Sequence, residues 1–166
     1  MPALPDLNAL HTARDFLLGR GLFVLTTWAL GTLLVSGYRV ARADPRSTAY
    51  HFHLMSVAWG AVNTALAAFG VLGLHRVPAA GLALGPEFRE QLFNETLFAL
   101  NTGLDVAYLM AGGWLHARAA APAARQPNRL LGYGRALWVQ GGFLFVFDAL
   151  MWAVLHWAGR GLGTAG

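Results

Sequence analysis

The sequence contains no cysteine and no lysine, and it has few charged residues of either sign. Without cysteine the chain cannot form disulfides, thiolate nucleophiles, iron–sulfur clusters or zinc sites with sulfur ligands. Only 12% of its 166 residues are charged, whereas soluble domains average about 25%. Because 56% of the residues are hydrophobic, the composition is typical of an integral membrane protein.

The net charge of +4 comes from arginine, which accounts for all twelve basic residues. These arginines stand mainly at the ends of apolar segments, so the expected partner is the lipid bilayer with its anionic headgroups, and nucleic acid is not expected. Every connecting segment is too short to fold independently. The sequence therefore predicts a single membrane domain over residues 1–166.

Four long apolar segments follow one another, at residues 17–40, 51–74, 93–115 and 133–157. A helix rises 1.5 Å per residue, so about 20 residues cross the hydrocarbon core of a bilayer. Tyrosine, tryptophan and arginine near the segment ends suit the headgroup level. The connections contain proline and are short, which favours antiparallel neighbours. We predict an all-α polytopic membrane protein, a four-transmembrane-helix antiparallel bundle.

Asp105 and Asp148 lie near the middle of the third and fourth apolar segments. A charge at that depth costs from about 3 to more than 10 kcal/mol, so such a group usually faces a partner, a wet cavity or an ion. Asn63 occupies the centre of the second segment, at the same predicted depth. Because burial and a neighbouring carboxyl both disfavour charge, we expect at least one of the two aspartates to be protonated at neutral pH.

Polar residues recur at helical spacing on the later segments. Asn101, Asp105 and Tyr108 form one stripe on the third segment, and Gln140 shares a face with Asp148 on the fourth. Amide and carboxyl groups facing lipid would lack hydrogen-bond partners, so these stripes should converge inside the bundle. The predicted binding residues are Asp105, Asp148, Asn63, Asn101, Gln140, Tyr108, Asn94 and Glu95.

Three functions are compatible with such a polar seam. The leading one is binding or relay of a proton, a cation or a small polar ligand, as in a transporter. The alternative is a non-catalytic assembly or interaction protein, in which protonated carboxyls and amides join the helices at about 0.6 kcal/mol per bond. A second alternative is a membrane enzyme acting on a lipid or quinone, with Asp105 and Asp148 as acid and base. An enzyme is the less expected outcome, and we assign no catalytic residue.

The histidines give only a weak indication of a metal site. Residues two apart on a helix point about 200° apart, so His51 and His53 cannot chelate one ion from one face. They could still meet His116 across two helices as a zinc or haem site. Interfacial positions without metal are the preferred interpretation, and no cofactor is assigned. At the opposite surface, Arg20 and Glu95 are placed to pair, either as a salt bridge or as a charged mouth of the seam.

Two short motifs resemble those of small uncharacterised bacterial four-helix membrane proteins. They are Asn101-x-Gly103-x-Asp105 with Tyr108, and Gly132-Tyr133-Gly134 followed by Gln140 and Asp148. The resemblance covers the second to fourth helices. It implies the four-helix fold and the same polar positions, and it implies no activity. We separately expect a multi-pass protein of the bacterial inner (cytoplasmic) membrane. Since four helices are few for a conduction path, a transporter of this kind is expected to be a homodimer that packs through its glycine-rich faces.

Overall fold

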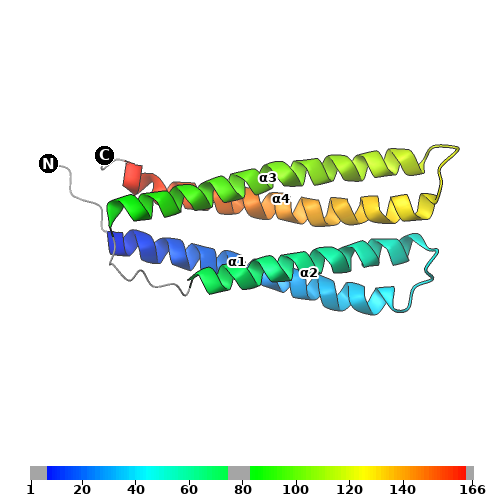
Figure 1. Cartoon of the computed structure of the whole chain (residues 1–166), viewed down its shortest axis with the longest axis horizontal. Helices are drawn as coiled ribbons and strands as arrows, with labels where there is room; N and C mark the ends of the chain where they lie inside the picture. Colours follow the sequence, from blue (N-terminus) through cyan, green and yellow to red (C-terminus); the bar gives the residue numbers. More distant parts are fainter. Residues whose placement is uncertain (1–6, 75–82, 164–166) are drawn as a thin grey trace.

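The computed structural model describes residues 7–74 and 83–163. Within them the chain forms four helices, α1 (Leu7–Val40), α2 (Thr48–Leu74), α3 (Leu84–Ala119) and α4 (Pro127–Gly163). The helices lie lengthwise side by side in antiparallel order, with the start of α1 and the end of α4 at the same end of the bundle (Figure 1). The predicted all-α class is confirmed.

All four helices start earlier than the hydropathy predicts, and α3 and α4 also end later. The prediction placed the first start at residue 17, whereas α1 begins at Leu7, and the third start at 93, whereas α3 begins at Leu84. Hydropathy marks only the apolar part of a helix, whereas hydrogen bonding extends the backbone into polar turns. The start of α2 carries a local signal, because the Ser47 hydroxyl accepts from the backbone N–H of Tyr50 at 3.1 Å.

Three of the described helices are long and apolar enough to cross a membrane, namely α1, α2 and α4. Helix α3 is long enough, but Asn94, Asn101 and Asp105 make it less apolar than the others. The structure thus supports a helical membrane protein with three candidate spans. Whether α3 also crosses depends on where its polar side chains point.

Helix α4 holds the bundle together because it contacts each of the other three helices. Helices that follow each other along the chain pair as α1 with α2 and α3 with α4 (Figure 1). The two pairs join because α4 packs against α2 and, over a smaller interface, against α1. The apolar core lies among α1, α2 and α4. It consists of Leu25, Ala67, Leu144, Phe147, Met151 and Leu155.

The outer surface of the bundle is apolar on every helix. Phe23 on α1, Phe69 on α2, Met110 on α3 and Trp157 on α4 are all strongly exposed. A soluble protein rarely exposes a continuous apolar surface of this extent, whereas a lipid-facing surface requires one. The middle of the exposed face of α3 is apolar like the others, whereas Asp105 is buried and Asn101 is half-buried.

A glycine allows a close backbone contact between α2 and the start of α4. A Cβ atom added at Gly132 would lie 2.6 Å from the carbonyl oxygen of Thr48 and 2.9 Å from the backbone nitrogen of Phe52. Both are backbone atoms, which cannot move aside as a flexible side chain can.

We therefore expect Gly132→Ala to destabilise the bundle by about 1–3 kcal/mol through overpacking, which should lower the melting temperature in detergent by several degrees. Gly142→Ala on the same helix is the matched control, since its Cβ would meet no atom within 4 Å. That control should leave the melting temperature unchanged or raise it, because alanine is the better helix former. Equal effects of the two substitutions would contradict the packing described for α2 and α4.

Candidate functional site

The central polar site lies between α3 and α4. Asp105 and Asp148 are only 3% and 5% exposed. Their carboxyl groups are within hydrogen-bonding reach of each other, and the Asn101 side chain is within reach of Asp148. Asn101 and Asp105 lie one turn apart, so both present their side chains to α4. We call Asp105 and Asp148 the carboxyl pair.

The contact between the two carboxyl groups requires a proton. Two ionised carboxylates repel each other and neither can donate a hydrogen bond, whereas one shared proton turns the contact into a hydrogen bond. If both groups are ionised, Oδ2 of Asp105 is buried without a hydrogen-bond partner. No basic side chain in the described parts of the chain pairs with either carboxyl. Two acids in contact, without a basic partner among the described residues, form an arrangement in which one proton can be shared.

Asn63 brings α2 to the same depth. Its side chain is buried, with the residue 1% exposed, and its Nδ2 has no hydrogen-bond partner. One turn earlier, the Trp59 ring meets Tyr108 of α3 edge-on, with ring centroids 4.8 Å apart. Since α2 and α3 run in opposite directions, this contact places Asn63 level with Asp105. A donor and an acceptor are thus both unsatisfied in one layer, and native interiors rarely tolerate this.

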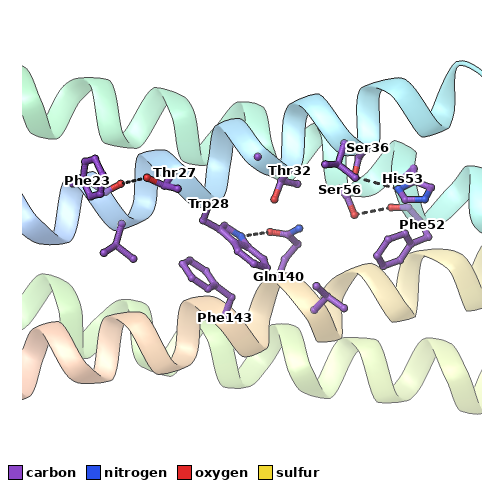
Figure 2. A pocket seen from close by; sticks show the side chains of 14 residues that line it. Phe23, Thr27, Trp28, Thr32, Ser36, Phe52, His53, Ser56, Gln140 and Phe143 are labelled. Carbon is purple, nitrogen blue, oxygen red and sulfur yellow. Dashed lines mark hydrogen bonds between the residues drawn. The ribbon is translucent and has the colours of Figure 1, made fainter.

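Gln140 belongs to a different interface. Its Oε1 accepts from Nε1 of Trp28 on α1 at 2.9 Å (Figure 2). Gln140 and Asp148 are eight residues apart, a rotation of about 80° around α4, which is enough to direct them at different neighbours. The sequence analysis placed Gln140 and Asp148 on one face and did not identify Trp28 as the partner of Gln140. The available signal was that a buried indole N–H requires an acceptor.

Glu95 lies in a second polar cluster, nearer the end of the bundle where α3 begins. Its carboxylate contacts Nδ1 of His156 at 3.0 Å and accepts from Gln91 Nε2 at 2.8 Å. The same Gln91 amide donates to the backbone oxygen of Leu155 at 2.6 Å. Asn94 is half-buried on the neighbouring part of α3. Ten residues of helix, about 15 Å, separate Glu95 from Asp105, so the predicted binding residues form two clusters.

The expected pairing of Arg20 with Glu95 does not form. The guanidinium of Arg20 lies over the Phe16 ring, 4.4 Å from its centroid. The buried arginine is instead Arg14, which binds Glu87 at 2.9 Å and Glu90 at 3.0 Å and so ties α1 to α3. Sequence analysis missed this pairing, although the acidic start of the third helix offers the charges that a buried arginine requires.

The three histidines considered as metal ligands have separate partners. His53 Nδ1 is hydrogen-bonded with the Ser36 hydroxyl at 3.2 Å. His116 donates from Nδ1 to the Gly112 carbonyl at 2.9 Å, and the His51 ring meets another ring edge-on. Among the residues that the structure describes, no group of three or more histidine, aspartate or glutamate side chains is placed to hold a metal ion.

The sequence pattern of a family of unknown function, DUF6992, matches residues 24–149, and the chain belongs to this family. The matched segment includes the carboxyl pair, Asn63, Asn101 and Gln140, and it excludes Arg14 and His156. No curated protein and no solved structure matches the chain significantly.

Removing the buried partner of Arg14 should cost more than removing its exposed partner. The Glu87 side chain is 6% exposed and the Glu90 side chain 52%. We expect Glu87→Gln to destabilise the protein by about 3 kcal/mol, because a buried charge is left incompletely compensated. Glu90→Gln is the matched control and should cost less than about 1 kcal/mol, as exposed pairs do. Melting curves in detergent measure both, and a larger loss for Glu90→Gln would refute this account of the cluster.

Proposed function

We propose that this member of the DUF6992 family is an integral membrane protein that crosses the bilayer four times and binds a proton at the carboxyl pair. The fourth span is supported by the distribution of side chains on α3. Its exposed residues include Leu100, Met110 and Trp114, whereas Asn101 and Asp105 face α4 or lie beside it. Because Asp105 is buried and Asn101 is half-buried beside α4, the polar residues in the middle of α3 are turned away from lipid, which makes the helix compatible with a bilayer.

The observation that carries the proposal is the contact of two acidic side chains inside an otherwise apolar bundle. Ionisable groups at membrane depth are costly and usually mark proton or ion pathways. The carboxyl pair holds two such groups on adjacent helices, and Asn101 orients one of them. A proton that binds and leaves such a pair changes the charge at the centre of the bundle, which is the elementary step of proton-coupled transport.

A proton fits the site better than a divalent cation does. Ca²⁺ takes about six to eight oxygen ligands and Mg²⁺ about six in near-octahedral geometry. The layer offers two carboxyl groups and the amides of Asn63 and Asn101, and the described residues include no third acidic group or histidine in metal-binding proximity. The unpaired Nδ2 of Asn63 adds a donor, which suits a small polar ligand or water and repels a cation.

If the protein is a transporter, it needs a second copy of the chain. Four helices enclose little space, so a conduction path would require a second copy of the chain, and we assign the protein to the bacterial cytoplasmic membrane as a homodimer. In the competing assembly reading, the same carboxyls only join α3 to α4. The two readings differ in what happens when the acids are replaced.

Infrared spectroscopy of the protein in lipid nanodiscs tests for the shared proton. A protonated carboxyl has a C=O stretch distinct from that of a carboxylate, and we expect this band in the wild type near neutral pH. It should be absent in the double variant Asp105→Asn/Asp148→Asn. Glu87→Gln is the control, since the carboxylate that it removes is paired with Arg14 and should not contribute to the band. A wild-type spectrum without the band, or a double variant that keeps it, would refute proton binding.

Replacing each aspartate alone tests whether the carboxyl pair serves function or only holds α3 and α4 together, and the melting temperature is the readout. Asparagine is nearly isosteric with aspartate, and its amide can donate to the remaining carboxyl. We expect Asp105→Asn and Asp148→Asn to melt at the same temperature as the wild type or higher, as happens when function retains an unfavourable group. A loss of several degrees in both variants would favour the assembly reading. Glu87→Gln is the reference variant in the same assay, because it removes a structural carboxyl and should lower the melting temperature.

A further inference from the structure

A groove of about 570 Å³ runs between α1, α2 and α4 and includes neither member of the carboxyl pair (Figure 2). One wall is the face of α1 from Phe23 to Ser36, the floor is the start of α2, and the other wall is α4 around Gln140. A second hollow of about 450 Å³ shares Phe23 and Val24 with it and extends the furrow along α1 toward Arg20. The groove opens to the outside of the bundle, which is the lipid side in a membrane.

Small residues keep the groove open on the α1 side. A Cβ atom added at Gly31 would meet no atom within 4 Å. Next to it, Trp28 stacks on Phe143 of α4 with ring centroids 4.0 Å apart and planes 7° apart, so α1 and α4 are joined at this point by their side chains. The walls beyond this stack are almost entirely apolar. A molecule lying there must therefore come from the hydrocarbon phase.

Polar groups are nevertheless present along the groove. Gln140 is 2% exposed, and its Oε1 is occupied by Trp28, whereas its Nε2 donates to none of the described residues. Ser36 and His53, which are hydrogen-bonded to each other, line the groove farther along, toward the end of α1 and the start of α2 (Figure 2). The groove thus combines an apolar furrow with one amide donor, Nε2 of Gln140, that has no acceptor among the described residues.

The depth of the Gln140 amide, rather than that of Ser36 and His53 near the helix ends, selects the class of ligand. Gln140 lies five residues, or about 8 Å, from the midpoint of the apolar segment 133–157, well inside a hydrocarbon core about 30 Å thick. Phospholipid headgroups and the carboxylate of a fatty acid stay at the membrane surface, because burying their charge is costly. The ligand therefore carries an uncharged hydrogen-bond acceptor into the hydrocarbon, and the aromatic walls favour a planar ring.

We propose that this groove binds an isoprenoid quinone. A ring carbonyl accepts from Nε2 of Gln140, the ring lies between Gln140 and His53, and the isoprenoid tail follows the furrow past Val24. The proposal concerns binding and includes no electron transfer. It rests on the membrane insertion proposed above and is independent of proton binding at the carboxyl pair.

Titration of the purified full chain in detergent with ubiquinone-2 tests the proposal, with the melting temperature as the readout. We expect a saturable increase of several degrees for the wild type. Gly31→Leu fills the groove and should weaken binding at least tenfold. Gly37→Leu is the matched control, because Gly37 lies on the same helix, also has open space around its Cβ position and does not line the groove. It should bind as the wild type does.

A second pair of variants covers the case in which Gly31→Leu folds poorly. Val35 and Leu34 are neighbours on α1 and both are exposed, but only Val35 lines the groove. Val35→Trp should therefore weaken binding and Leu34→Trp should not. The double variant Asp105→Asn/Asp148→Asn should retain quinone binding, which separates this proposal from the proposed proton site.

Four results would overturn the proposal. They are no saturable shift with ubiquinone-2, an equal shift with oleate, unaltered binding in both Gly31→Leu and Val35→Trp, or loss of binding in the double aspartate variant. An equal effect of oleate would show that the groove accepts any acyl chain. Loss in the double aspartate variant would place the quinone at the carboxyl pair.

Discussion

The contact between Asp105 and Asp148 constrains the rest of the bundle. Neither carboxyl can face lipid, so α3 and α4 must pack with their polar sides together. This packing leaves α3 with an apolar outer face despite its polar composition, and Asn101 contributes a further bond at the same interface. Helix α3 is the least apolar of the four helices, and it packs mainly against one neighbour, α4. Its place in the bundle follows from one buried interaction.

Helix α4 uses different residues at each of its three interfaces. Asp148 faces α3, Gln140 faces α1, and the glycine at position 132 lies against α2. The proposed proton site and the proposed quinone groove therefore share one helix but no side chain. Away from this middle region, the Arg14 and Glu95 clusters join helices near the membrane surface, where solvent or headgroups can complete their bonding. Charge pairing thus occurs at one end of the bundle, whereas the two carboxyl groups at its centre have no basic partner among the described residues.

Much of the fold was predictable because hydropathy reports directly on lipid contact. The four apolar segments gave the number and order of the helices, and the depths of Asn63, Asp105 and Asp148 followed from counting residues at a constant rise. Partners were harder to predict. Helical spacing says which residues share a face, but α4 has three neighbours, so a shared face did not mean a shared interface for Gln140 and Asp148. The Arg20 prediction failed for a related reason, since several arginines and glutamates lie near the same surface.

The sequence by itself determined the all-α class, the apolar surface and the presence of acidic residues near the middle of α3 and α4, because each depends only on residue type and position along a helix. The tertiary structure alone decided that Asp105 meets Asp148, that Trp28 bonds Gln140, that Arg14 is the buried arginine, and that a groove opens beside Gly31. These features depend on the rotation of each helix about its axis and on which pairs of helices touch. That rotation is set by the packing of all four helices at once, and no single segment of sequence contains it.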